Sequence, residues 1–111
     1  MKVYRDVLDK VISEGFLYTL WNGQLKIREG IVVESRRCSK REAIFRHGSR
    51  YCDWTRCSPE PRALVHAHLW LPERDDALAR ELLIEYYTEN IKRLEKQIEG
   101  YQANIKILQD A

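Results

Sequence analysis

A seven-residue apolar repeat in the last third of the chain constrains the fold more than any other feature. Isoleucine recurs every seven residues from Ile84 to Ile105, and a tyrosine or leucine follows each isoleucine after three residues. The eight residues are Ile84, Tyr87, Ile91, Leu94, Ile98, Tyr101, Ile105 and Leu108. An apolar period of 3.5 residues keeps one narrow seam of a helix facing a partner along its whole length. The repeat therefore predicts a long, self-associating helix.

The predicted helix is too long for the rest of one subunit to cover. From Glu73 to Asp110 it would measure about 57 Å, whereas a domain of about 100 residues has a diameter of roughly 26 Å. The helix must bury its seam against a copy of itself or fold back at Gly100. The positions beside the seam are mostly neutral side chains such as Asn90 and Gln97, which discriminate weakly between partners. Homotypic pairing is the simplest interpretation.

The first part of the chain favours strands. Asn22-Gly23 lies between the strand-forming runs 16–21 and 24–27, and this pair is typical of a type I′ hairpin turn, in which both turn residues need positive φ. The second strand continues to about Arg36, with a candidate β-bulge at Gly30. Residues 3–12 have the spacing of a short amphipathic helix, and a strand is nearly as well supported.

The next segments are less regular. Cys38–Phe45 fits either a short helix capped by Ser39 or an edge strand. Ala63–Leu71 predicts a single strand that carries Leu64, His66, His68 and Trp70 on one face. Pro72 lies near the first turn of the long helix.

These segments predict an α+β fold, with a small antiparallel β-sheet and a long C-terminal coiled-coil-type helix. Residues 1–72 form the strand-rich part with a basic middle, and residues 73–111 form the helical oligomerisation segment of the same domain. A chain of 111 residues that is 44% hydrophobic has the material for one modest core.

No run of 18 apolar residues and no signal-peptide pattern occurs, so we expect a cytoplasmic protein without a membrane partner. Three cysteines, an odd number, indicate free thiols in a reducing compartment.

Positive charge is concentrated in the middle of the chain. The net charge is +2, but the segment 36–62 has eight basic and three acidic residues, so the remainder is negative. Such a surplus attracts an anionic partner. A solvated, arginine-rich loop is an equally good interpretation of this segment. The pair Arg36 and Arg37 lies at its start.

Two clusters could bind a ligand. Cys52, Cys57, His66 and His68 are residue types that bind zinc, but their spacing is irregular, and structural cysteines with surface histidines are the simpler interpretation. Because the spacing is poor, we expect no metal and no cofactor. The face with His68 and Trp70 could instead stack and hydrogen-bond a nucleotide base.

Arg80 is a further candidate for binding a ligand. It occupies a seam position where an apolar residue is expected, and a charged group there often reaches for a carboxylate or a ligand phosphate. Asp76 lies four residues earlier, so a surface ion pair is the simpler alternative.

No catalytic motif is present: the serines lie in no nucleophile-elbow context, and no glycine-rich phosphate loop occurs. We therefore expect a protein that is not an enzyme.

The order of parts resembles that of the Thoeris anti-defence family of phage sponges. The likeness covers roughly residues 25–95 and centres on the strand-to-helix segment from Trp70 to Arg80. The resemblance implies a non-enzymatic oligomer that sequesters a cyclic nucleotide or cyclic ADP-ribose signal between its subunits. It would carry a ligand-binding role over to Arg80 and Asp76, and also to Arg36 and Arg37. The segment 52–57 matches nothing in that family.

The leading hypothesis is a homo-oligomer that binds an anionic nucleotide-type ligand without chemistry. Arginines would hold the phosphate, and Trp70, Tyr51 or Trp54 would hold the base. The alternative is a coiled-coil dimer that docks on a host protein or on DNA through the basic middle. A third hypothesis is a purely structural assembly protein.

Overall fold

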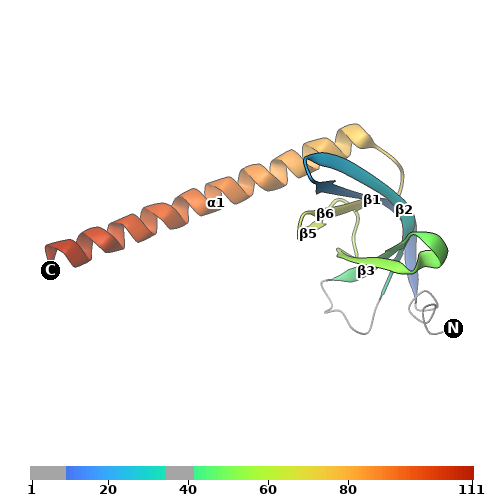
Figure 1. The fold of residues 1–111 in the computed structure, drawn as a ribbon, viewed down its shortest axis with the longest axis horizontal. Coiled ribbons are helices and arrows are strands. Elements are labelled where there is room, and N and C mark those ends of the chain that lie inside the picture. Colours follow the sequence, from blue (N-terminus) through green and yellow to red (C-terminus); the bar gives the residue numbers. More distant parts are fainter. Residues whose placement is uncertain (1–9, 35–41) are drawn as a thin grey trace.

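The computed structural model describes residues 10–34 and 42–111 and shows an antiparallel sheet with one long helix (Figure 1). The strands are β1 (Val11–Trp21), β2 (Gln24–Val33), β3 (Ala43–His47), β4 (Asp53–Cys57), β5 (Leu64–Val65) and β6 (His68–Leu71), and the helix is α1 (Asp76–Asp110). The predicted α+β class is therefore confirmed. Among the described residues, no helix is long and apolar enough to cross a membrane.

The six strands form one sheet in the order β4-β3-β2-β1-β6-β5, and every neighbouring pair is antiparallel. The sheet curls so that β4, at one edge, approaches β5 and β6 at the other. The indole N–H of Trp70 on β6 donates a hydrogen bond of 2.6 Å to the carbonyl oxygen of Ser58, which directly follows β4. This buried bond joins the two edges of the curled sheet.

The inner face of the curled sheet holds the first apolar core. Its buried members are Leu17, Val32, Ala43, Phe45, Cys57 and Trp70, each at most 1% exposed. They come from β1, β2, β3, β4 and β6, so the core closes only when the sheet has curled. Trp70 is the largest fully buried side chain among the described residues. Side chains therefore fill the inside of the curled sheet where this core lies.

Two glycines make the curl possible. Gly15 on β1 and Gly30 on β2 are direct cross-strand partners. A Cβ on Gly15 would lie 2.6 Å from the carbonyl oxygen of Leu71, and a Cβ on Gly30 would clash with the carbonyl oxygen of Arg46. Neighbouring backbone therefore approaches closely at both positions. The predicted bulge at Gly30 is wrong, because the register is regular there and shifts only between Val11 and Ser13.

The first hairpin is confirmed at the predicted turn. Asn22 has φ of 51° and Gly23 has φ of 74°, as a type I′ turn requires, and Trp21 pairs with Gln24 across the turn. β2 ends at Val33, before the predicted end at about Arg36.

The predicted single strand over Ala63–Leu71 is wrong, because this segment is a second hairpin. β5 and β6 are joined by a turn at His66 and Ala67, whose φ values are 50° and 64°. Two consecutive residues in the left-handed region form such a turn, but histidine and alanine are weak sequence signals for it. The consequence is that His66 lies exposed in the turn, whereas His68 lies in a strand.

The other two ambiguous segments are partly resolved. Ala43–Phe45, the end of the segment 38–45, is a buried part of β3, so it forms a strand. The predicted edge position is wrong, because β3 pairs with β2 on one side and with β4 on the other. Residues 38–41 lie outside the described residues, as do residues 1–9. Val11 and Ile12 belong to β1, which agrees with the strand alternative for the end of the segment 3–12.

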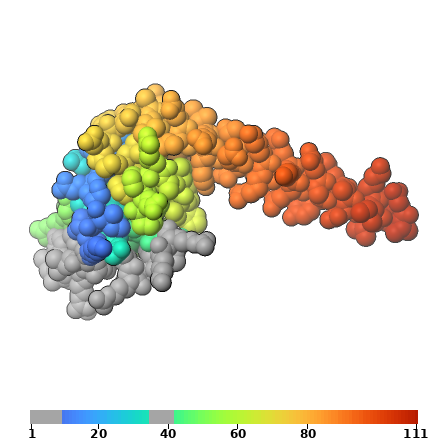
Figure 2. Space-filling view, turned by 180° about the vertical axis from the view of Figure 1, so that it is seen from behind, coloured from blue at the N-terminus to red at the C-terminus, as the bar shows by residue number. Residues whose placement is uncertain are grey.

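The helix packs on the outer face of the sheet through its first two turns. The second core joins Tyr18, Leu69 and Leu71 of the sheet to Ala79 and Leu83 of α1, the two buried residues of this helix. Beyond these turns α1 projects away from the sheet as a narrow arm (Figure 2). It runs without a break through Gly100, so the predicted alternative of a helix that turns back there is wrong.

The helix begins at Asp76, four residues after Pro72. The Asp75 side chain caps it and accepts a hydrogen bond of 3.1 Å from the Leu78 amide. The Tyr18 hydroxyl accepts a 2.9 Å bond from the Asp75 amide and donates a 3.1 Å bond to Asp76. Burial raises the pKa of this hydroxyl, so it keeps the proton that it donates. One tyrosine therefore joins the helix start to the sheet.

Replacing Tyr18 with Phe should lower the free energy of unfolding by about 1–3 kcal/mol, because the partly buried Asp75 amide loses its acceptor. Urea unfolding followed by circular dichroism measures this change. Tyr51→Phe is the matched control, since that ring is exposed and its hydroxyl forms no hydrogen bond with the described residues. Equal stability of the two variants would contradict the anchoring role of Tyr18.

Candidate functional site

The apolar seam of α1 is exposed along its whole length. The exposed fractions of the eight seam side chains range from 39% for Tyr87 to 74% for Leu108. Isolated apolar side chains on a surface are ordinary, but a continuous stripe of large ones is typical of an interaction site. The seam is therefore a continuous apolar stripe that the described residues leave uncovered.

The seam of α1 begins just after the two residues that the sheet buries. Ala79 and Leu83 face the sheet, and Ile84 follows Ala79 by five residues. At about 100° per residue, Ile84 points about 140° away from Ala79. The next seam residue, Tyr87, points only about 40° away from Leu83, but it is exposed because the contact with the sheet ends at Leu83. The contact with the sheet therefore leaves the seam open to another helix.

The structure does not bring the predicted ligand residues together in one subunit. Trp70 and His68 lie on the inner side of β6, because they pair with the inner positions of β1. Arg80 lies exposed on α1, which packs against the outer side of the same sheet. Trp70 is 1% exposed and its indole N–H is engaged by Ser58, so it offers no face for stacking. The predicted base platform at Trp70 is therefore wrong.

Asp76 has partners of its own at the helix start. The Arg74 guanidinium donates two hydrogen bonds to its carboxylate, of 3.1 and 3.2 Å, and lowers the pKa of Asp76. Arg80 forms no hydrogen bond or ion pair with the described residues, so Asp76 pairs with Arg74 instead. The ligand-binding role of Arg80 stays a prediction, and Arg36 and Arg37 lie outside the described residues.

The structure does not bring together the four residues of the alternative zinc site. Cys57 is buried in the inner core beside Leu17, whereas Cys52 is exposed before β4 and His66 lies in the β5–β6 turn. Among the described residues, no group of three or more histidine, cysteine or acidic side chains is placed to hold a metal ion.

The four arginines of the basic middle that the structure describes differ in burial and location. Arg46 is buried in β3, whereas Arg50, Arg56 and Arg62 are exposed in three different segments. Arg56 forms a long ion pair of 3.9 Å with Glu42. Tyr51 and Trp54, the other two predicted base-stacking residues, are exposed and remain accessible to a ligand.

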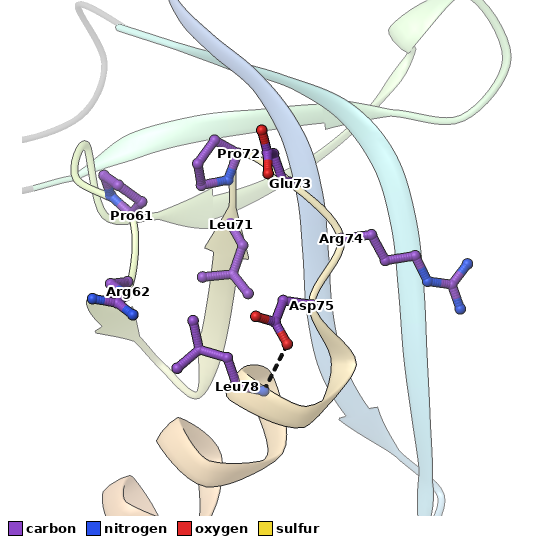
Figure 3. Close-up of a pocket in the computed structure, with 8 residues that line it drawn as sticks. All are labelled: Pro61, Arg62, Leu71, Pro72, Glu73, Arg74, Asp75 and Leu78. Carbon is purple, nitrogen blue, oxygen red and sulfur yellow. Dashed lines mark hydrogen bonds between the residues drawn. The ribbon is translucent and has the colours of Figure 1, made fainter.

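A pocket lies beside the helix start, as Figure 3 shows. It has a volume of about 320 Å³, and its walls are Pro61, Arg62, Leu71, Pro72, Glu73, Arg74, Asp75 and Leu78. Two arginines are matched there by two carboxylates, and the Arg74 side chain points away from the cavity. The Leu78 amide already donates its hydrogen bond to the Asp75 side chain. The pocket therefore has neither the charge nor the free amide that would favour a phosphate.

A polar cluster occupies the inner face beside the apolar core. Its members are Thr19, Arg28, His47, Thr55 and His68, which come from β1, β2, β3, β4 and β6. His68 Nδ1 lies 3.2 Å from the Thr19 hydroxyl, and His47 Nε2 lies 3.1 Å from the Thr55 hydroxyl. We call these five residues the inner polar cluster.

Burial and positive charge act on both histidines of this cluster. Burial is the larger cause that lowers the pKa of His47, and the Arg28 guanidinium lowers it further against the opposing effect of Asp53. Burial also lowers the pKa of His68, with smaller effects from His66 and Arg28. Both imidazoles are therefore neutral near pH 7, and Arg28 gives the cluster its positive charge.

The sequence analysis included His68 but missed Arg28 and His47. Strand alternation carries the signal for both, since Arg28 is directly opposite the core residue Leu17 and His47 follows Phe45 by two residues. This signal becomes useful only when the pairing register is known.

Comparison of the chain with protein-family models, with curated proteins and with solved structures finds no match. The resemblance to the Thoeris anti-defence family stays a prediction.

Acidification from pH 7.5 to pH 5.5 should destabilise the protein. A histidine whose pKa is lowered by folding binds its proton more readily in the unfolded chain, so stability falls as the pH drops through the ordinary histidine pKa of about 6.5. Urea unfolding at both pH values, at one protein concentration, measures the loss. The variant with His47→Gln and His68→Gln should lose most of this dependence, whereas His66→Gln should keep it. An unchanged pH dependence in the double variant would contradict the assignment.

Proposed function

We propose that the chain is a non-enzymatic homo-oligomer whose α1 helices pair along the exposed seam and which binds an anionic nucleotide-type ligand. The observation that carries the proposal is the exposure of all eight seam side chains on the part of α1 that extends beyond its contact with the sheet. The seam from residue 84 to residue 108 is about 37 Å long. That length spans more than three heptads, which is enough for a stable coiled coil.

A second copy of the chain is the occupant that the seam fits best. Isoleucine at each first position of the repeat packs well against isoleucine of an identical helix. The flanking positions are Thr88, Asn90, Glu95, Gln97, Gln102 and Asn104. Only Glu95 among them is charged, so two identical helices bring little like-charge repulsion together. A partner of opposite charge would have little to recognise along these flanks.

The ligand part of the proposal is supported by the charge distribution. The segment 36–62 has a surplus of positive charge, and the inner polar cluster adds Arg28, which has no carboxylate partner among the described residues. A binding protein needs such positive groups for an anionic ligand, whereas a purely structural assembly does not. The resemblance to the phage sponges adds to this proposal a role in sequestering a signalling nucleotide.

The alternative function, docking on DNA through the basic middle, has weaker support. The exposed arginines that the structure describes in this segment come from three different parts of the chain, and Arg46 is buried. Binding to duplex DNA that falls steeply and log-linearly with salt concentration would favour the alternative. A saturable, weakly salt-dependent interaction with a mononucleotide would favour the proposal.

Replacing Ile91 and Ile98 together with Asp should dissociate the oligomer. Each change places a charge in the apolar seam and removes packing worth about 2–5 kcal/mol per site. Sedimentation equilibrium measures the mass of the assembly.

The matched control is the double variant Ala103→Asp with Ile107→Asp, which adds the same charges off the seam on exposed positions of the same helix. The control should keep the assembly. A wild-type chain that sediments as a monomer, or equal masses of the seam variant and the wild type, would refute the role of the seam.

A further inference from the structure

The geometry points to a phosphate-binding site on the inner face of the sheet, formed by Arg28, His47 and His68. The inference rests on the proposed function for the nature of the ligand, and it names the residues that hold the ligand's anionic group. None of the features that the sequence predicted at the helix start is part of this site.

The three side chains are brought to one face by the strand register. Arg28 is the direct partner of Leu17, a member of the inner core, so its side chain is on the same face. His47 is two residues after the inner residue Phe45, and their rings lie 6.1 Å apart. His68 contacts Thr19, which is two residues after Leu17 on β1. Arg28 is therefore a diagonal neighbour of His47 on β3 and of Thr19 on β1, and Thr19 in turn contacts His68.

Arg28 lacks a counter-charge within the described part of the chain. It forms no ion pair or hydrogen bond with residues 10–34 or 42–111, although it is only partly exposed. Asp53 is the carboxylate that acts on His47, and it packs against Gly48. A partly buried guanidinium without a carboxylate favours an anionic ligand, because charge pairs are stronger away from water.

The two histidines complete a set of donors. Each uses one ring nitrogen for a threonine hydroxyl, Nδ1 in His68 and Nε2 in His47. When the threonine donates its proton, the second ring nitrogen carries a hydrogen and is a donor. Arg28 can then bind two oxygens of a phosphate in the planar, bidentate geometry that guanidinium prefers, and the imidazoles can donate to the others.

A cation fits the cluster less well than an anion. The Arg28 guanidinium repels a metal ion, and its field already acts on both histidines. The described residues also contain no set of three metal-binding side chains. The chemical class is therefore a phosphate group, either as free inorganic phosphate or as part of a nucleotide.

The test is isothermal titration of the full-length protein with inorganic phosphate and, separately, with adenosine monophosphate. Arg28→Gln should weaken the binding of both probes about tenfold to a hundredfold, the loss expected for a charge-assisted bidentate contact. Arg93→Gln, an exposed change of the same charge on the distal part of α1, should change the affinity less than about twofold. Tighter binding of the monophosphate would assign the site to a nucleotide, and equal affinities would assign it to the phosphate group alone.

Three outcomes would overturn the inference: no binding of either probe to the wild type at millimolar concentration, equal losses in both variants, or a loss in Arg80→Gln without one in Arg28→Gln. If Arg28→Gln does not fold, Arg28→Lys keeps the charge but loses the bidentate geometry, and it should still weaken binding.

The seam variant with Ile91→Asp and Ile98→Asp separates this inference from the proposed assembly. It should bind phosphate with unchanged affinity as a monomer, because the cluster lies within one sheet. A wild-type chain that assembles but does not bind phosphate would refute this site and leave the role of the seam standing. A wild-type chain that binds phosphate as a monomer would support this site and refute the role of the seam.

Discussion

The attachment of the first two turns of α1 to the outer face of the sheet is the contact on which the rest of the structure depends. Tyr18 joins the strand β1 to Asp75 and Asp76, and the apolar contacts of Ala79 and Leu83 fix the direction of the helix. Because the attachment ends there, the remaining turns of α1 receive no cover from the sheet. An isolated helix is marginal in water, so the proposed pairing along the exposed seam would stabilise the arm.

The curled sheet separates two surfaces that the sequence places side by side. β6 and the helix start are joined by only four residues, but Trp70 and His68 lie on the inner side, while α1 lies on the outer side. The sheet therefore separates the two proposed roles, with the helix that would assemble on the outer side and the residues that would bind phosphate on the inner side. Variants of one surface can be tested without changing the other.

The predictions that succeeded depend on local signals. The Asn22-Gly23 turn and the heptad repeat each specify their own conformation through backbone φ or through periodicity. The predictions that failed depend on distant contacts. The turn at His66 and Ala67 lacks the usual turn residues, and the burial of Trp70 requires β4 to return to β6. Arg28 and His47 could not be recognised as neighbours, because only the pairing register of β2 with β3 relates them.

Arg80 connects the two halves of the proposed function. It lies seven residues before Tyr87, at the equivalent position of the preceding heptad, and it is exposed. In a parallel pair of helices, Arg80 of both copies would face each other across the seam, and their like charges would oppose pairing at that end. In an antiparallel pair, each Arg80 would instead lie opposite the end of the other helix. An anion bound between the two arginines would favour the parallel arrangement by neutralising them. The orientation of the helices therefore decides whether Arg80 acts as a ligand contact between subunits or only selects against one arrangement.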